Sequence, residues 1–391
     1  MTDQRLRELF NDLAETLPEG ASRAGELWRQ GTRSRTRRRW TVAAAAATVS
    51  AFVVVGIAVF PEPVERGITV YPGVALTPTP TIPPAPAMDI APQPSGEAAL
   101  PTAATALPER WADIPVVTAV SGPVLALAEF GDGQIYVMKS GGRIPLKVKL
   151  DDSVDADGNG GTPLKPNSLA PDGTMAAFPQ KDEVVVVDLV IGQTRRYPVP
   201  GFNEVVLWRG EQLLVEQGEA NYLLDLATGK MRRQPYKGFT GVAGYRDLRI
   251  VSPGKGGRTV IQEGRSEVEL DLQAITHGGS RPAGILGDQA WQRDGLVALS
   301  AFAQDDQAGG ADMVVVADAA TGRVVRTLLL PWGHSADTRC GKGGCPVRGW
   351  ISQGVIIESE DRLLGWNINT GALSRVAELP EGVTAYSLRS G

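Results

Sequence analysis

At residues 314–322 the chain reads Val-Val-Val-Ala-Asp-Ala-Ala-Thr-Gly, an apolar strand followed by an aspartate and a Thr-Gly turn. The valines favour an extended strand. We expect the aspartate, Asp318, to bond to its own backbone, and Gly322 to take a positive φ before the next strand. The pattern returns at 184–192, 222–229 and 364–371, with a weaker copy at 268–272. Such a unit is a structural signature, not a site.

The marker aspartate or asparagine recurs at a fairly even interval. It falls at Asp188, Asp225, Asp271, Asp318 and Asn367, which are 37, 46, 47 and 49 residues apart. This interval is the length of a four-stranded propeller blade. Two β-sandwiches fit less well, because the repeat is close to blade length throughout.

One more copy precedes these five, with strands expected at 124–129, 134–138 and 144–148. The segment Ser168-Leu169-Ala170-Pro171-Asp172-Gly173 then opens the next blade. We therefore predict an all-β fold, a six-bladed β-propeller over residues 110–391. The last strand, Val383 to Leu388, should pair with the first blade and close the ring. A seven-bladed ring is the alternative, if residues 112–120 belong to a further blade.

A long uncharged run lies far upstream, at residues 40–60. Seventeen of its 21 residues are apolar, and a helix of this length reaches roughly 31 Å, enough for a bilayer core. We predict one transmembrane helix. A cleaved signal peptide fits less well, because the leader is long and the end of the run offers no small-x-small cleavage site. A buried soluble helix also fits less well, because the run is apolar on every face.

Charge predicts the orientation of this helix. Six arginines fall within residues 29–39, whereas Arg66 is the only basic residue from Pro61 to Glu109. The positive-inside rule then places residues 1–39 in the cytoplasm and the large domain outside. The net charge of −5 hides this asymmetry, and we expect no nucleic-acid interface on the outer part.

The cytoplasmic tail, residues 1–39, has a helical pattern of its own. An apolar stripe recurs at helical spacing and ends before Pro18; it consists of Leu6, Leu9, Phe10, Leu13 and Leu17. A tail this small cannot bury the stripe alone. It either docks on a cytoplasmic protein or lies on the inner leaflet. The tail has no histidine or cysteine, so we expect no zinc-clasped module.

Residues 61–109 are rich in proline, alanine and threonine. This composition favours extended polyproline conformations and predicts a linker between the anchor and the propeller.

The Ser168–Gly173 segment and the Asp-x-x-Thr-Gly turns resemble those of WD40-like and TolB-like propellers. The layout of the whole chain resembles actinobacterial single-pass membrane proteins encoded beside extracytoplasmic-function sigma factors. This resemblance implies that the cytoplasmic tail binds a sigma factor and that the propeller lies outside the membrane.

The only two cysteines, Cys340 and Cys345, lie five positions apart in a glycine-rich loop on the expected outer side. An oxidised pair persists there, so we predict a local disulfide that pins the loop. Redox-active thiols are the alternative.

An acidic loop carries Asp155, Asp157 and Asn159 in the spacing that opens a calcium loop. The twelfth position is Pro166 instead of a bidentate glutamate. These three residues are therefore a weak calcium candidate, and an inter-blade turn is the other interpretation. No other cofactor is expected.

Catalytic motifs are missing from the sequence. It has no Gly-x-Ser-x-Gly elbow, no His-Glu-x-x-His and no phosphate loop. We therefore do not expect an enzyme, although a propeller hydrolase is a minor alternative. We expect a sensor or anti-sigma-like regulator, or an envelope protein that binds a ligand or protein without signalling.

Overall fold

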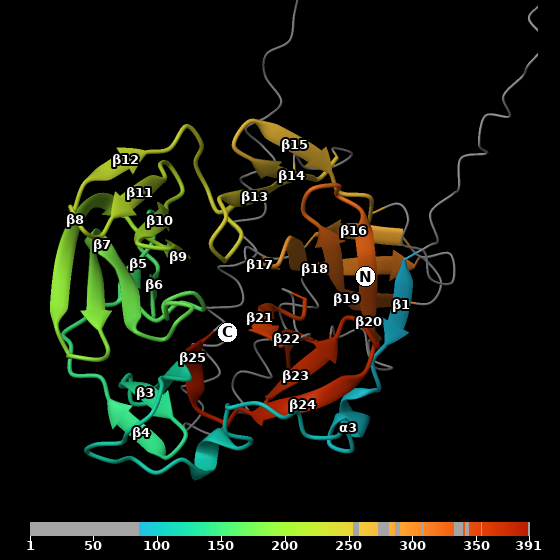
Figure 1. Cartoon of the computed structure of the whole chain (residues 1–391), viewed down its shortest axis with the longest axis horizontal. Coiled ribbons are helices and arrows are strands. Elements are labelled where there is room, and N and C mark those ends of the chain that lie inside the picture. The colour runs from blue at the N-terminus through green and yellow to red at the C-terminus, as the bar shows by residue number, and fades with distance from the viewer. Residues whose placement is uncertain are drawn as a thin grey trace, which may run out of the picture. The chain divides into compact units, whose positions relative to one another are not determined.

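A computed structural model describes most of residues 86–389 (Figure 1). The described ranges are 86–252, 258–272, 281–285, 290–305, 309–331, 339–340, 344–352 and 354–389. The expected cytoplasmic tail (1–39), the expected membrane helix (40–60) and the first part of the linker lie outside them. Within these ranges, no helix has the length and apolar character that a membrane crossing requires.

The chain folds as an all-β propeller, with sheets arranged around a common centre (Figure 1). In three sheets the strands follow one another outward, each antiparallel to the one before. The first comprises β9 (Val205–Arg209), β10 (Gln212–Glu216), β11 (Tyr222–Asp225) and β12 (Met231–Arg233). The second comprises β13 (Leu248–Val251), β14 (Val260–Glu263) and β15 (Ser266–Glu269). The third comprises β21 (Val347–Ile351), β22 (Gly354–Ser359), β23 (Arg362–Asn367) and β24 (Leu373–Glu378).

The expected ring closure is confirmed. The last strand, β25 (Val383–Leu388), pairs antiparallel with β2 (Ala126–Phe130), and β3 (Ile135–Lys139) and β4 (Gly142–Pro145) continue outward. The Leu169 N–H donates to the Ser387 hydroxyl oxygen at 2.9 Å, and that hydroxyl donates to the Pro166 carbonyl at 2.7 Å. The C-terminal strand β25 therefore connects the first sheet to residues 166–169, which lead into the next sheet.

The largest sheet has six strands and includes a segment from far upstream. Its order is β1, β20, β19, β18 and β16, and β17 also pairs with β18. The bounds are β1 Ala87–Ile90, β16 Arg281–Ile285, β17 Trp291–Arg293, β18 Leu296–Asp305, β19 Gly309–Asp318 and β20 Val324–Pro331.

Five sheets contain three or more strands, so the described residues show five blades and not the six that we expected. The second expected blade contributes a two-stranded sheet of β7 (Met175–Asp188) and β8 (Thr194–Phe202). The Leu189 N–H donates to the Thr174 carbonyl at 2.8 Å. The two ends of β7 therefore meet, and the strand reverses near Asp182, whose φ is 64°.

The expected innermost strand of that blade is reduced to one contact. Leu169 makes a single isolated bridge to Ala176 across the turn at Gly173, and the pairing stops there because the chain already turns at residues 165–168, where the Ser168 N–H donates to the Lys165 carbonyl at 2.9 Å. A second two-stranded sheet, β5 (Ser153–Val154) and β6 (Gly160–Gly161), precedes this segment.

The repeated turns form as expected. Asp318 Oδ1 accepts the N–H groups of Ala320 and Thr321 at 3.0 and 2.8 Å, and Gly322 has a φ of 68°. The equivalent side-chain oxygens of three more turns accept backbone N–H groups in the same way; these are Asp188, Asp225 and Asn367.

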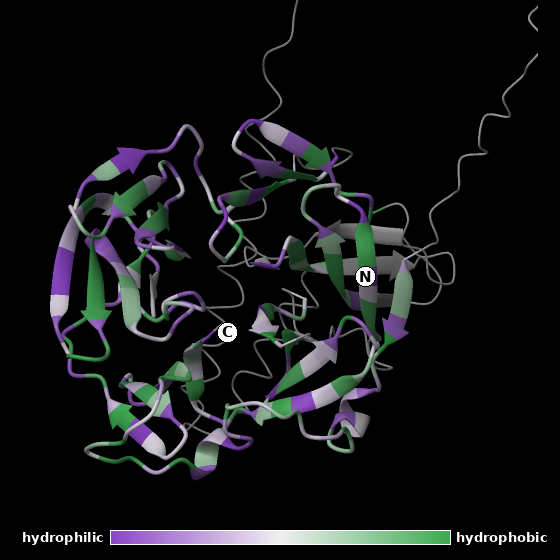
Figure 2. Cartoon of the chain, viewed as in Figure 1, coloured by the Kyte–Doolittle hydropathy of each residue, from purple (hydrophilic) through white to green (hydrophobic). Residues whose placement is uncertain are grey.

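The core lies within and between the sheets. The run from Val184 to Val187 is buried on both faces, as in strands covered on both sides. Trp291, Trp350 and Trp366 pack in one buried cluster, although they come from two neighbouring sheets. Figure 2 shows that the outermost strand β12 is largely hydrophilic, which agrees with the exposure of all three of its residues.

The residues 87–117, which we call the outer belt, follow the outer edges of three successive sheets. They contain β1, the short helix α3 (Pro94–Glu97) and the 3₁₀ helix η1 (Trp111–Asp113). β1 pairs parallel with β20. Further along, Thr102 and Arg110 make parallel bridges to β24, and Val116 makes one to β4.

The belt changes the expected boundary between linker and propeller. Residues 87–109 were predicted to be linker, but they pair with the propeller. The physical reason is that outermost strands present unpaired backbone groups, and a proline can still accept at such an edge through its carbonyl. The Arg375 N–H donates to the Pro101 carbonyl at 2.8 Å, and the Arg143 N–H donates to the Pro115 carbonyl at 2.9 Å.

Candidate functional site

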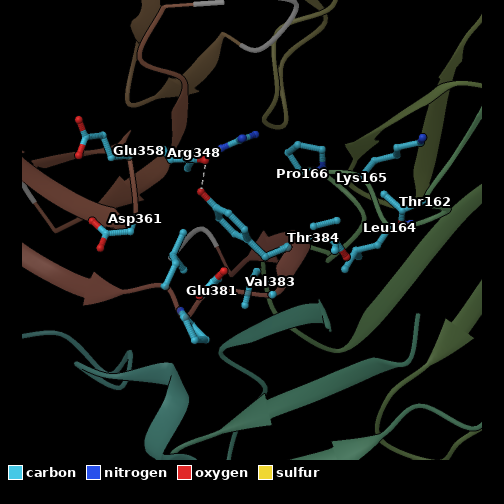
Figure 3. Close-up of a pocket in the computed structure, with 16 residues that line it drawn as sticks. Thr162, Leu164, Lys165, Pro166, Arg348, Glu358, Asp361, Glu381, Val383 and Thr384 are labelled. Carbon is cyan, nitrogen blue, oxygen red and sulfur yellow. Dashed lines mark hydrogen bonds and ion pairs between the residues drawn. The ribbon is translucent and has the colours of Figure 1, made fainter. Parts of the chain in front are cut away.

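A cavity of about 580 Å³ lies where the ring closes (Figure 3). Four segments distant in the sequence line it: the loop 162–166, β21, the turn between β22 and β23, and residues 379–386. These segments meet because β25 returns to the first sheet. The cavity therefore depends on the fold and not on any local motif.

A charged cluster forms one wall of the cavity. The Tyr386 hydroxyl donates to Glu358 Oε2 at 2.5 Å, and Arg348 Nε donates to the same oxygen at 2.5 Å. The Arg348 guanidinium also lies 5.2 Å from the centre of the Tyr386 ring. Burial raises the pKa of the Tyr386 hydroxyl well above its ordinary value, and the Glu358 carboxylate raises it further against the opposing effect of Arg348. Tyr386 is therefore a neutral hydrogen-bond donor at physiological pH.

On the opposite side of the cavity, the buried carboxylate of Glu129 fixes two of the lining side chains. Glu129, from β2, accepts the hydroxyl groups of Thr162 and Thr384 on its two oxygens. Both threonines line the cavity. Lys165 also lines it, and burial lowers the pKa of its ammonium group while Glu204 and Glu129 oppose that shift.

The rim of the cavity carries three further acids, Glu360, Asp361 and Glu381. Its apolar lining residues are Leu164, Pro166, Leu379, Pro380 and Val383. The described lining residues thus combine apolar side chains with hydroxyl, amine, guanidinium and carboxylate groups. This arrangement suits binding of a partly apolar, polar-edged ligand.

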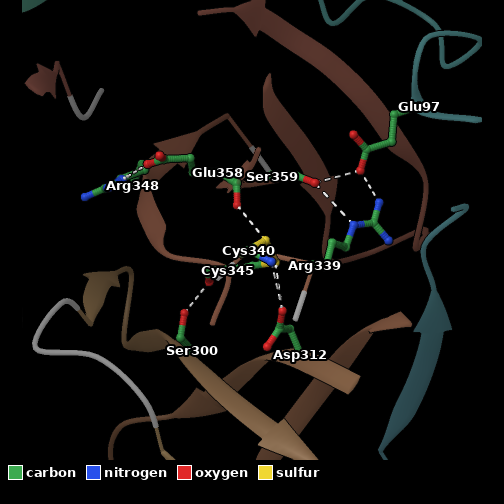
Figure 4. Close-up of a disulfide and its surroundings, with 9 residues drawn as sticks. All are labelled: Glu97, Ser300, Asp312, Arg339, Cys340, Cys345, Arg348, Glu358 and Ser359. Carbon is green, nitrogen blue, oxygen red and sulfur yellow. Dashed lines mark hydrogen bonds and ion pairs between the residues drawn. A yellow bond between two sulfur atoms is a disulfide. The ribbon is translucent and has the colours of Figure 1, made fainter. Parts of the chain in front are cut away.

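The predicted disulfide is confirmed. Cys340 and Cys345 are bonded, with their Cα atoms 4.8 Å apart (Figure 4). Cys340 Sγ lies 3.4 Å from the Glu358 carbonyl oxygen, and the Cys340 N–H donates to Asp312 Oδ2 at 3.3 Å. Cys340 is thus held against β19 and β22. Asp312 and the two sulfurs have the proximity of a metal site, but bonded sulfurs offer no thiolate ligand.

Beside the disulfide lies a buried ion pair that the sequence analysis missed. Glu97 of the belt and Arg339 both have fully buried side chains, and Arg339 Nη2 donates to Glu97 Oε1. The Ser359 hydroxyl donates to the same oxygen at 2.8 Å and accepts from Arg339 Nε at 3.2 Å. No sequence motif marks this contact, because Glu97 lies in a segment whose composition predicts a linker.

A second acid of the belt was missed for the same reason. Arg326 donates to Asp89 through Nε at 2.6 Å and through Nη2 at 2.9 Å, and Trp366 Nε1 donates to Asp89 Oδ2 at 2.9 Å. The Arg326 hydrogen bond lowers the pKa of the Asp89 carboxyl, burial opposes this, and Trp366 lowers it further. The one available signal is that Asp89 stands between the apolar residues Met88 and Ile90.

The weak calcium candidate forms a self-contained turn. Asp155 Oδ1 accepts the backbone N–H groups of Asp157 and Asn159 at 3.0 and 2.9 Å, and the Asn159 amide donates to both Asp155 oxygens. This geometry is that of an inter-blade turn, and calcium binding stays a prediction. The tail residues Leu6, Leu9, Phe10, Leu13 and Leu17 lie outside the described residues.

No family model and no curated protein matches this sequence. Solved structures resemble it at low identity. The β-propeller domain of the Trilobed protease from Pyrococcus furiosus is 12% identical, with a TM-score of 0.37 and coverage of 69% of this chain and 98% of that one. AztD from Citrobacter koseri is 12% identical, with a TM-score of 0.35 and coverage of 68% and 89%. BamB from Moraxella catarrhalis is 13% identical, with a TM-score of 0.32 and coverage of 69% and 77%.

Proposed function

We propose that this chain is a single-pass membrane protein whose extracytoplasmic propeller binds an envelope ligand or protein segment in the cavity at the ring closure. We further propose that its cytoplasmic tail docks on a sigma factor, so that the chain acts as a sensor. The observation that carries the binding proposal is the cavity wall of Tyr386, Glu358 and Arg348. It offers a neutral hydrogen-bond donor beside a carboxylate that is paired with an arginine.

The binding proposal is tested by photo-crosslinking in cells. A photoreactive amino acid at Glu381, on the cavity rim, should give an adduct with a discrete ligand or protein that mass spectrometry identifies. The same amino acid at Tyr245, which is 63% exposed and does not line the cavity, is the control. Filling the cavity with Val383→Trp should remove the adduct. Identical adducts from both positions, or an adduct that persists in Val383→Trp, would contradict the proposal.

The signalling proposal is tested separately on the tail. Leu9→Asp with Leu13→Asp in the full chain should abolish co-purification of a sigma factor, because it places charge on the apolar stripe. Gln4→Asp with Asn11→Asp makes the same charge change off the stripe and should retain the sigma factor. If neither the natural chain nor the control retains one, the chain is an envelope binding protein without this signalling role.

Topology is tested by protease protection of sealed membranes. Digestion of residues 110–391 from the cytoplasmic side would overturn the proposed orientation.

A further inference from the structure

We propose that the Cys340–Cys345 disulfide is a redox-sensitive latch that holds the outer belt against the propeller. While the bond is intact, the buried ion pair between Glu97 and Arg339 keeps residues 94–100 of the belt docked on the propeller. When a thiol reductant opens it, this part of the belt loosens and the wall of the cavity changes. The inference deepens the proposed function, since it assigns a regulation to the same site.

The first step is the chemistry of the buried pair. Glu97 and Arg339 are removed from water completely. Within the described residues, Glu97 Oε2 and Arg339 Nη1 make no hydrogen bond, and Arg362 Nη1 lies 3.6 Å from Glu97 Oε2. Burying two charges with incomplete hydrogen bonding costs free energy that their attraction does not fully offset. The docked position therefore needs support from elsewhere.

The second step is that the disulfide supplies this support. Arg339 directly precedes Cys340, and Cys345 is fully buried. The Ser300 hydroxyl donates to the Cys345 carbonyl, and Asp312 accepts the Cys340 N–H, so both ends of the bridge are held on β18 and β19 (Figure 4). The covalent bond thus fixes the backbone from which Arg339 reaches the belt. Opening it restores conformational entropy to that backbone.

The third step links the latch to the cavity. Ser359 bonds to Glu97 and Arg339, whereas the preceding residue, Glu358, bonds to Tyr386 and Arg348 in the cavity wall. The Glu358 carbonyl also contacts Cys340 Sγ. The adjacent residues Glu358 and Ser359 of β22 therefore contact the belt, the disulfide and the cavity wall. A shift of the latch changes the position of the Glu358 carboxylate.

The redox step is an ordinary thiol–disulfide exchange. A thiolate of a dithiol reductant attacks Sγ of Cys340, which is the more exposed of the two cysteines. A mixed disulfide forms, the Cys340–Cys345 bond breaks, and Cys345 leaves as a thiolate that takes up a proton. The second thiol of the reductant then displaces Cys340, which is also protonated. The protein gains two electrons and two protons, and the reductant becomes a disulfide.

Hydrogen exchange on the full chain tests the latch. The amides of Gly96, Ala99 and Leu100 donate within the belt, and dithiothreitol should speed their exchange about tenfold, which corresponds to ~1.4 kcal/mol of local opening free energy. Amides of β11 should not change. Glu97→Gln should give the same acceleration with the disulfide intact. In the double variant Cys340→Ser, Cys345→Ser, the same belt amides should exchange fast both with and without dithiothreitol.

Two results would overturn the latch. One is unchanged belt exchange after complete reduction, verified by mass. The other is equal acceleration in β11 and the belt, since that would make the disulfide a global stabiliser only. Both readouts use the protein without a ligand, so a failure of the binding proposal is detected separately.

Discussion

Two acidic side chains, Asp89 and Glu97, attach the outer belt to the sheets beneath it, and they do so in different ways. Asp89 is partly exposed and receives three well-directed hydrogen bonds from Arg326 and Trp366. Glu97 is fully buried, and among the residues that the structure describes its Oε2 accepts no hydrogen bond. A bidentate arginine–carboxylate pair near the surface is a stable attachment, whereas the buried pair depends on its surroundings. The first attachment is therefore intrinsic to β1, and the second is conditional.

Asp89→Asn should lower the free energy of unfolding by about 1–3 kcal/mol at pH 7, because Arg326 loses a charged acceptor. The folded-state pKa of Asp89 is lowered, so its contribution is present above the unfolded value near 3.8 and is lost as the pH falls through the folded value. The natural chain and the variant should therefore converge in acid. Urea unfolding at several pH values measures both effects.

Glu263→Gln is the matched control for this prediction. The hydrogen bond from Arg246 also lowers the pKa of Glu263, but both side chains are more than 40% exposed. Such a surface pair contributes only ~0.2–1 kcal/mol. If both variants lost the same free energy of unfolding, Asp89 would stabilise the fold no more than an ordinary surface acid does.

At the scale of elements, each repeated turn has the same backbone but a different neighbour. Gly322 approaches the backbone of β15, where a β-carbon would lie 1.9 Å from the Glu269 carbonyl oxygen. Gly192 has a similar positive φ, but a β-carbon there would meet nothing within 4 Å. The Gly322 turn therefore contacts the neighbouring sheet, whereas the Gly192 turn only reverses the chain.

Gly322→Ala should destabilise the propeller by about 3–5 kcal/mol, because the clash with β15 adds to the strain of a positive φ. Gly192→Ala should lower the free energy of unfolding by only about 1 kcal/mol, since the alanine is strained by the positive φ but has no clash with a neighbour. Thermal unfolding of both variants checks the difference. Equal destabilisation of the two variants would show that β15 shifts away from the new β-carbon without a loss of stability.

The sequence predicted these turns because their chemistry is local: an aspartate or asparagine and a glycine fix the backbone wherever they occur. The disulfide is local in the same sense, since its cysteines lie five positions apart, whereas the closing strand was predicted from its place after the last complete blade. It did not predict the blade count, because Leu169 is apolar but its pairing depends on the neighbouring turn. It also missed the belt, since proline-rich composition indicates an extended chain but not what that chain pairs with. The cavity wall of Tyr386, Glu358 and Arg348 could not be predicted: Arg348 and Glu358 lie on the paired strands β21 and β22, but Tyr386 joins them only through the closing strand β25.

At the scale of the whole molecule, one strand closes the ring. β25 pairs with β2, bonds to the 166–169 segment through Ser387 and carries Tyr386 into the cavity. Stability and the candidate site thus depend on the same C-terminal residues.

Truncation before Val383 should leave β2 as an open edge and give a protein that associates and unfolds without a single transition. Removal of residues 390–391 alone leaves β25 in place and is the control. Analytical ultracentrifugation and urea unfolding distinguish the two. A monomeric, cooperatively unfolding truncation would show that the remaining sheets are stable without closure.

The order of contacts along the belt has a mechanical consequence. A pull on the chain before Ala87 reaches the β1–β20 pairing first, the buried Glu97 second and the pairing of Val117 with Arg143 last. Detachment under tension would therefore proceed in stages, each with its own threshold. At about 3.3 Å per residue, release of residues 87–101 would lengthen the tether by up to roughly 50 Å while the ring of sheets stayed closed.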